Sequence, residues 1–118
     1  LELAVFGRVR GGKVICWNGA GSTSNVFYFP RSGGHERITE GHKPVHPTQK
    51  PLKLWITLLQ LITDPGHIVF DPFLGSGTSV IAAERTGRVC YGIEKDPAYC
   101  DVIVDRWEKE TGKKAVRP

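Results

Sequence analysis

The apolar residues between positions 51 and 93 alternate between helical spacing and short unbroken runs. Pro51 suits a first helical turn, where its missing N–H costs nothing, and residues at helical spacing follow it: Leu52, Trp55 or Ile56, Leu59 and Ile62. The turn-forming run 63–66, Thr-Asp-Pro-Gly, ends this predicted helix. The next apolar run, Ile68-Val69-Phe70, is typical of a strand in the middle of a parallel sheet.

A second helix and a second strand are predicted further along. The glycine turn Gly75-Ser76-Gly77 leads into a helix from Thr78 to about Thr86, which Gly87 stops. Residues 89–93 then form a second apolar run, which predicts a second strand.

The third predicted helix begins at Pro97, behind the capping residue Asp96, and ends at Gly112. Its inner face is predicted to carry four residues: Cys100, Ile103, Val104 and Trp107. Helix, strand, helix, strand and helix in this order predict an α/β fold with a right-handed crossover. We therefore expect an incomplete parallel sheet with flanking helices.

Residues 1–45 carry less pattern. Two short apolar segments around a turn at Gly7 to Gly12 predict an N-terminal hairpin. Glycine, serine and polar residues dominate residues 18–42, in which the aromatic run 27–30 predicts one short strand. The chain is therefore divided into a connector with a hairpin, residues 1–45, and an α/β half-domain, residues 46–118.

Composition limits the class of protein. The chain has 118 residues, 40% of them hydrophobic, which is enough for one small core. The longest apolar-rich stretch is too short to span a bilayer, so a membrane protein is not expected. The three cysteines show no C-x-x-C spacing, which predicts neither a disulfide framework nor a metal site and favours a reducing compartment. Because the sequence starts at Leu1 and contains no methionine, we expect it to be a fragment.

Candidate chemistry gathers where the first predicted strand ends. Residues 71–78, Asp-Pro-Phe-Leu-Gly-Ser-Gly-Thr, follow the strand directly, and their two glycines let the backbone approach a ligand closely. The start of the following helix suits a carboxylate or a phosphate. Glu94 lies 19 residues after Gly75, where an acidic residue is placed to bind the hydroxyls of a ribose. The segment therefore predicts a nucleoside with an anionic group beyond its sugar.

The carboxylate of Asp71 narrows the choice of nucleoside. Val80 occupies the place of the third glycine of a dinucleotide-binding turn, and the sequence has no G-x-x-x-x-G-K-[ST] motif. A carboxylate repels a pyrophosphate and attracts an ammonium or a sulfonium group, so S-adenosylmethionine fits better than NAD or ATP. The alternative is that Asp71 only caps the turn and Glu94 only caps the last helix; their joint spacing favours the ligand site.

Three motifs of the chain resemble those of the amino-group DNA methyltransferases, which methylate N6 of adenine or N4 of cytosine. Residues 71–78 look like the cofactor motif of that family. Residues 46–51, His-Pro-Thr-Gln-Lys-Pro, match the motif that precedes it in the β-type order, and residues 92–99 look like the ribose-binding segment. The resemblance implies the Rossmann-like fold of S-adenosylmethionine-dependent methyltransferases, with S-adenosyl-L-methionine as cofactor.

The resemblance also implies roles for individual residues. Asp71 and the turn 75–77 would hold the methionine part of the cofactor, and Glu94 would bind the ribose hydroxyls. Phe73 and Lys95 would flank the adenine. The full set of implied cofactor-binding residues is Thr48, Lys50, Asp71, Pro72, Phe73, Gly75, Ser76, Gly77, Thr78, Glu94 and Lys95.

The His-Pro-Thr-Gln-Lys-Pro block would close the site from the opposite wall. The resemblance implies that Lys50, by its charge, and Thr48, by its hydroxyl, secure the carboxylate end of the cofactor. Without the motif, Lys50 is a solvated residue ahead of a helix. A ligand role and a role as a loop residue packed by prolines both stay open for His46, and Gln49 is predicted to be a turn residue.

One part of the family pattern is missing. The family transfers the methyl group through an Asp-Pro-Pro-Tyr-like motif, which this sequence lacks. Residues 96–99, Asp-Pro-Ala-Tyr, directly follow Glu94 and open a helix, so we interpret them as a cap. The chain thus resembles the carboxyl-terminal half of the enzyme. No catalytic residue is assigned, and the fragment alone is expected to be inactive.

The expected partner is double-stranded DNA, with adenine preferred over cytosine as the methylated base. The net charge of +4 is compatible with a polyanion without requiring one. The basic residues of the connector belong either to a solvated loop or to a phosphate contact, and Arg37 and Lys43 are the predicted DNA contacts. The missing catalytic half of the same polypeptide, or self-association, would cover the open sheet edges.

Two further hypotheses stay open. The chain could be a non-catalytic module that binds S-adenosylmethionine or DNA, or the same fold could methylate RNA, protein or a small molecule. A restriction-modification enzyme of the cytoplasm, encoded by a bacterium, an archaeon or a phage, is the expected setting.

Overall fold

The computed structural model describes residues 16–21, 23, 26–27, 39–40, 43–44 and 49–116. For the two short segments between residues 39 and 44, the description is limited to the backbone. The predicted N-terminal hairpin lies almost wholly outside the described residues, as do three of the candidate site residues: Arg37, His46 and Thr48.

Five elements form the α/β unit: α1 (Leu52–Ile62), β3 (Ile68–Asp71), α2 (Thr78–Thr86), β4 (Val89–Gly92) and α3 (Pro97–Thr111). The apolar spacing predicted all five, with bounds that differ by at most one residue. The α/β fold class is therefore confirmed. Two further strands, β1 (Thr39–Glu40) and β2 (Lys43–Pro44), form a short antiparallel pair in the connector, where a loop was expected.

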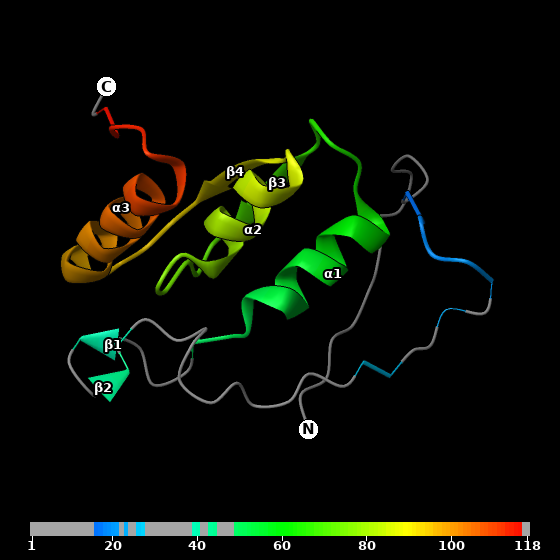
Figure 1. Ribbon diagram of the computed structural model, residues 1–118, viewed down its shortest axis with the longest axis horizontal. Coiled ribbons are helices and arrows are strands. Elements are labelled where there is room, and N and C mark those ends of the chain that lie inside the picture. The colour runs from blue at the N-terminus through cyan, green and yellow to red at the C-terminus, as the bar shows by residue number, and fades with distance from the viewer. Residues whose placement is uncertain are drawn as a thin grey trace.

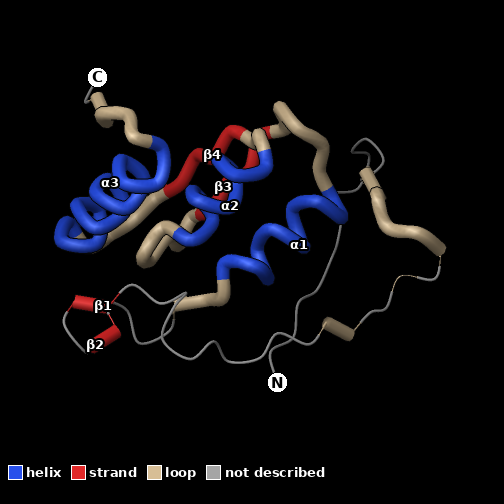
Figure 2. Tube along the Cα trace, in the orientation of Figure 1, coloured by secondary structure: helices blue, strands red, loops and turns tan. Residues whose placement is uncertain are grey.

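β3 and β4 pair in parallel, with Ile68 opposite Val89 and Asp71 opposite Gly92. α2 is the crossover between them, and the three helices run in the same general direction (Figure 1). Because the two strands are parallel, both end at the same edge of the sheet, and there the chain turns into α2 and α3 (Figure 2). Residues 71–78 and Glu94 lie at this edge.

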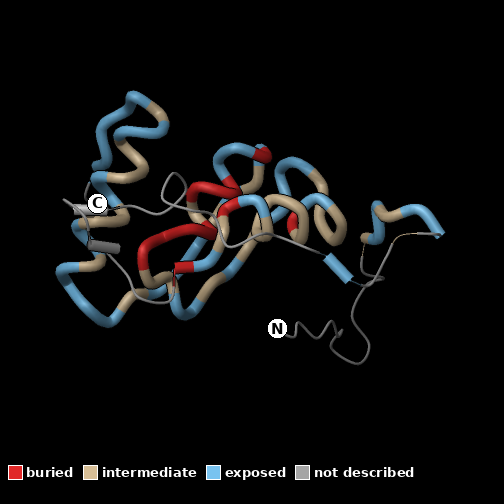
Figure 3. Tube along the Cα trace, turned by 60° about the horizontal axis from the view of Figure 1, so that its bottom comes forward, coloured by how far each residue is buried: buried red, intermediate tan, exposed pale blue. Residues whose placement is uncertain are grey.

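The core lies between α1 and α2, and its buried apolar residues are Leu52, Leu59, Ile81, Ala82 and Ala83. The small side chains of Ala82 and Ala83 let α1 approach α2 closely. Val69 and Cys90 pack against this cluster from the sheet. In Figure 3 the buried residues concentrate in α2 and the loop before it, with few elsewhere, so α2 is the centre of the packed unit.

The other face of the sheet is exposed. Its large apolar side chains are Ile68, Phe70, Val89, Tyr91 and Ile93. Ile68 is 68% and Phe70 is 61% exposed, so among the described residues this strand lacks the surroundings of a strand in the middle of a sheet. The reason is that side chains alternate along a strand, and the helices pack only on the face that carries Val69 and Cys90.

The inner face of α3 also differs from its prediction. Ile103 and Trp107 are half-buried as expected, whereas Cys100 and Val104 are exposed. The indole N–H of Trp107 donates to Glu84 Oε2 at 3.2 Å, and Arg106 is half-buried as well. The side of α3 that faces α2 therefore includes Arg106 and the polar contact of Trp107, and it differs from the side that apolar spacing alone predicts.

Gly92 supports the loop that follows β3, because Leu74 packs directly over it. A Cβ atom at Gly92 would lie 2.4 Å from Leu74 Cδ2. We expect Gly92→Ala to lower the free energy of unfolding by about 1–3 kcal/mol in urea denaturation, because Leu74 has to move. Gly21→Ala is the control, since its Cβ atom would meet nothing within 4 Å. Equal losses in the two variants would contradict this packing.

An ion pair joins α2 to α3 and predicts a pH dependence of stability. Arg85 Nη2 lies 3.0 Å from Glu110 Oε2, and the hydrogen bond from Arg85 lowers the pKa of Glu110 below its usual value. A carboxylate with a lowered pKa in the folded state stabilises the fold above its unfolded pKa and loses that contribution as pH falls through its folded pKa.

We therefore expect this ion pair to contribute less than about 1 kcal/mol to the free energy of unfolding, and to lose that contribution as the solution is acidified from about pH 5. Thermal unfolding followed from pH 7 to pH 3 measures the effect. The Glu110→Gln variant should show a shallower dependence on pH than the parent. Identical slopes would show that the pair contributes nothing.

Candidate functional site

Residues 71–78 form a tight loop between β3 and α2. Gly75 and Gly77 have φ values of 54° and 76°, in the left-handed region that favours glycine. The N–H of Gly77 donates to the carbonyl of Leu74 at 2.8 Å and closes the turn. A Cβ atom at Gly77 would also lie 2.9 Å from Cγ1 of Ile103, so both the backbone conformation and the available space require glycine there.

Asp71 braces this loop from the end of β3. Its Oδ1 accepts the N–H of Phe73 at 2.9 Å, and its Oδ2 accepts the hydroxyl of Ser79 at 2.6 Å. Ser79 is buried in the first turn of α2. Asp71 therefore caps the turn, as the structural alternative expected, and its carboxylate stays at the edge where both strands end.

Glu94 braces the same loop from the end of β4. Its Oε2 accepts the N–H of Gly75 at 2.7 Å, and its Oε1 accepts the N–H of Asp96 at 2.9 Å. The N-cap of α3 is Asp96, whose Oδ1 accepts the N–H of Ala98 at 2.9 Å. Glu94 is therefore more than a cap of the last helix, because it ties the glycine turn to the neighbouring strand.

The two acidic residues hold backbone groups two positions apart in one loop. Asp71 binds the N–H of Phe73 and Glu94 binds the N–H of Gly75. The loop is thus hydrogen-bonded to two carboxylates, that of Asp71 at the end of β3 and that of Glu94 just beyond the end of β4. Such a site carries negative charge at two points and glycine backbone between them, which suits a ligand with cationic and hydroxyl groups.

The start of α2 is the closed side of this site. Ser76, Thr78 and Ser79 are buried, so contacts from Ser76 and Thr78 to a ligand have to come from the backbone. The first N–H groups of a helix have no carbonyl before them within that helix, and they carry its partial positive charge. An anionic group is favoured at this point of the loop.

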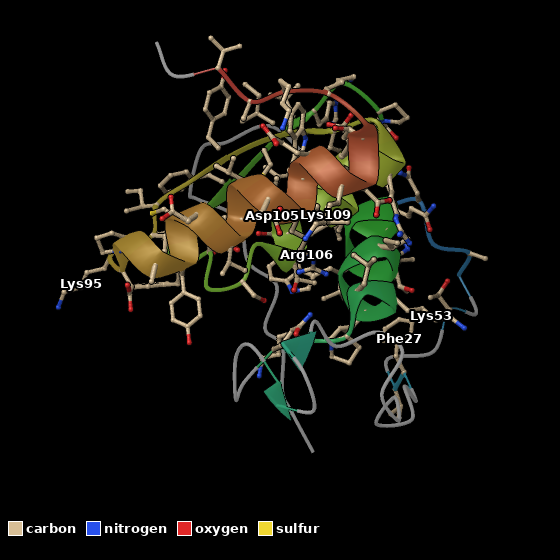
Figure 4. The ribbon with its side chains drawn as sticks, turned by 60° about the vertical axis from the view of Figure 1, so that its left-hand side comes forward. Phe27, Lys53, Lys95, Asp105, Arg106 and Lys109 are labelled. Atoms are coloured by element: carbon tan, nitrogen blue, oxygen red, sulfur yellow. The ribbon has the colours of Figure 1, made fainter. Side chains whose placement is uncertain are left out.

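The remaining predicted residues lie around the loop. Phe73 is 86% exposed, and its ring is open to a flat ligand. Pro72 is exposed beside it. Lys95 lies at the N-terminal end of α3 and points away from the helices (Figure 4). Lys50 is exposed immediately before α1. No side chain of Lys43 is described, so its contact with DNA stays a prediction.

Residues 14–105 match the sequence profile of N6_N4_Mtase, DNA methylase. The chain belongs to this DNA methylase family. The matched residues include the whole of the loop 71–78 and Glu94. The resemblance to the amino-group DNA methyltransferases is thereby confirmed.

Individual members of the DNA methylases extend well beyond this chain. The type II methyltransferase M.HindIII of Haemophilus influenzae (strain ATCC 51907 / DSM 11121 / KW20 / Rd) is 43% identical over 93 residues, which are 76% of this chain and 28% of M.HindIII. The crystal structure of the M1.HpyAVI–SAM complex matches 79% of this chain and 44% of that chain, with a TM-score of 0.61 and 29% identity. The PvuII DNA methyltransferase (cytosine-N4-specific) matches 57% of this chain and 26% of that chain, with a TM-score of 0.51 and 32% identity. The chain therefore spans less than half the length of each of these proteins.

Sequence reasoning missed two residues that hold the loop 71–78 through hydrogen bonds, Ser79 in α2 and Arg106 in α3. Arg106 Nη1 donates to the carbonyl of Ser76 at 3.1 Å and to Thr78 Oγ1 at 3.2 Å. Burial lowers the pKa of Arg106 below its usual value. The sequence carried one sign of this role. Arg106 lies three residues after Ile103 and therefore on the apolar side of α3, where a charged group needs hydrogen-bond partners because it is removed from water.

The part of the chain that the structure describes contains no group of three or more His, Cys, Asp or Glu side chains able to hold a metal ion. Among the described helices, α1, α2 and α3 are all too short or too polar to cross a membrane.

Proposed function

We propose that this chain is the S-adenosyl-L-methionine-binding portion of a DNA methyltransferase that acts on the exocyclic amino group of a base. The observation that carries the proposal is the loop 71–78, held between Asp71 and Glu94 at the edge where two parallel strands end. Membership of the DNA methylase family and the likeness to a structure solved as a SAM complex support it.

The donor set of the loop fits this cofactor. Asp71 accepts one described hydrogen bond on each carboxylate oxygen, and each oxygen has a second acceptor position for an ammonium group. Glu94, beyond the end of β4, is the proposed acceptor for the ribose hydroxyls. A pyrophosphate in the same place would face two carboxylates, which disfavours a dinucleotide.

Other residues complete the proposed cofactor site. The N–H groups of Gly75 and Gly77 are bonded to Glu94 and Leu74, so those of Ser76 and Thr78 are the ones proposed for the methionine part. The exposed ring of Phe73 offers a surface for adenine. Lys95 and Pro72 would line the adenine pocket. Lys50 and Thr48 would secure the carboxylate end, in accord with the family motif at 46–51.

The proposed role of this chain in the reaction is alignment. S-Adenosyl-L-methionine supplies a methyl group on a positively charged sulfur, so the group that leaves is a neutral thioether. Asp71, Glu94 and the glycine turn bind and orient the donor for an in-line approach of the base amine. The base has to leave the duplex stack, at a cost of a few kcal/mol, before the amine reaches the methyl group.

Transfer itself is proposed to need residues beyond this chain. The sequence lacks the Asp-Pro-Pro-Tyr motif, and the chain matches only 28% of M.HindIII and 44% of the chain in the M1.HpyAVI–SAM complex. The exposed apolar face of β3 and β4 is where we expect the rest of the same polypeptide, or a second copy, to pack. This chain alone is therefore proposed to be inactive.

We propose N6 of adenine as the methylated position, on the likeness of the His-Pro-Thr-Gln-Lys-Pro block to adenine-type members. N4 of cytosine is the second candidate, because a cytosine-N4-specific enzyme matches this chain at a TM-score of 0.51. Double-stranded DNA is the proposed substrate, with Arg37 and Lys43 as phosphate contacts. The cytoplasm of a bacterium, an archaeon or a phage host is the proposed location, within a restriction-modification system.

The carboxylates of Asp71 and Glu94 should determine cofactor affinity. In the full-length protein, Asp71→Asn and Glu94→Gln keep the size of each side chain but remove its charge, and we expect each to weaken S-adenosylmethionine binding by about 10-fold or more in isothermal titration calorimetry. Asp105→Asn is the matched control, because Asp105 pairs with Lys109 on the exposed side of α3. Unchanged binding in both site variants would overturn these roles.

Methyl transfer tests the proposed activity. Full-length protein incubated with S-adenosylmethionine carrying a labelled methyl group should label duplex DNA, whereas residues 1–118 alone should not. DNA binding by the full-length protein should weaken steeply as salt rises. Label on RNA or protein but not on DNA would contradict the proposed substrate, and digestion of labelled DNA to nucleosides separates N6-methyladenine from N4-methylcytosine.

A further inference from the structure

We propose that Arg106 is a positioning residue that holds the cofactor loop in its binding conformation from behind, through α3. The inference rests on the proposed function, since it assigns a support to the loop that binds the cofactor. Arg106 extends from α3 toward the start of α2, while its neighbours Asp105 and Lys109 pair with each other at 2.6 Å on the exposed side of the helix (Figure 4).

One nitrogen of Arg106 bridges two points of the loop. Nη1 donates to the carbonyl of Ser76 at 3.1 Å and to the hydroxyl oxygen of Thr78 at 3.2 Å. Between these two residues lies Gly77, whose φ of 76° produces the sharp entry into α2. The two hydrogen bonds of Arg106 therefore lie on either side of Gly77, whose left-handed conformation sets the direction of the N–H groups that follow it.

α3 also lies close to Gly77 through its apolar side. Ile103, one turn before Arg106, lies so close to Gly77 that a Cβ atom there would be 2.9 Å from its Cγ1. Ile103 thus blocks Gly77 from moving toward α3, while Arg106 binds the groups on either side of it. Together they fix residues 76–78 from the side opposite the proposed ligand.

The positive charge of Arg106 lies beside the N-terminus of α2. The N-terminus of α2 is the positive end of that helix, and a cation beside it is unfavourable for the helix. The half-buried guanidinium thus raises the positive potential at the loop. An anionic group of the ligand beside the loop offsets the unfavourable interaction between this charge and the helix. Arg106 therefore stabilises the bound state in addition to holding the loop in shape.

The test compares variants of Arg106 in the full-length protein. Arg106→Met removes the charge and both hydrogen bonds, and we expect S-adenosylmethionine to bind roughly 10- to 100-fold more weakly in calorimetry. Because a single nitrogen makes both contacts, the ammonium group of Arg106→Lys should restore most of the affinity. Trp107→Phe is the control, because it removes a polar contact between α3 and α2, to Glu84, without touching the loop.

Hydrogen exchange without cofactor supplies a second readout. Amides of residues 74–79 should exchange faster in Arg106→Met than in the parent, and Trp107→Phe should leave them unchanged. The proposal would be overturned if Arg106→Met bound S-adenosylmethionine as tightly as the parent does. It would also be overturned if Arg106→Lys did not restore the affinity. If Arg106→Met does not fold, Arg106→Gln replaces it, and unchanged affinity there overturns the proposal equally. A parent protein that binds no S-adenosylmethionine would instead refute the proposed function, while the exchange data would still test the hold of Arg106 on the loop.

Discussion

The hydrogen bond from the N–H of Gly75 to the carboxylate of Glu94, 2.7 Å long, is the contact on which the candidate site depends. It ties the loop after β3 to the chain that leaves β4, and it involves a charged acceptor, which makes it one of the stronger kinds of hydrogen bond in proteins. The proposed acceptor for the ribose is the same carboxylate. One side chain therefore holds the glycine turn and is also the proposed partner of the ribose.

The parallel register explains why this carboxylate reaches the loop. Asp71 lies opposite Gly92, and beyond the strands the N–H of Ile93 donates to the carbonyl of Asp71 at 3.0 Å. The N–H of Leu74 donates in turn to the carbonyl of Ile93 at 3.1 Å, which brings the loop back beside the extension of β4. Gly92 makes room for Leu74 in this arrangement. Helix α3 then supports the loop from behind, through Arg106 and Ile103.

Much of this unit could be predicted from local patterns in the sequence. Turn and capping residues predicted the bounds of α1, α2 and α3, and the spacing from Gly75 to Glu94 correctly placed an acidic residue beside the glycine turn. Which face of the apolar run 68–70 is covered could not be predicted, because such a run does not say on which side other segments pack; the structure leaves Ile68 and Phe70 exposed. Arg106 escaped prediction for a similar reason: its two partners lie 28 and 30 residues earlier in the chain, and only the packing of α3 against α2 brings them together.

A crystal structure of the full-length protein with S-adenosylmethionine tests the central claim most directly. The account predicts that the carboxylate of Glu94 lies within hydrogen-bond distance of both ribose hydroxyls, with the methionine part between Asp71 and residues 75–77. A cofactor bound elsewhere, or one whose ribose lies out of reach of Glu94, would contradict the account.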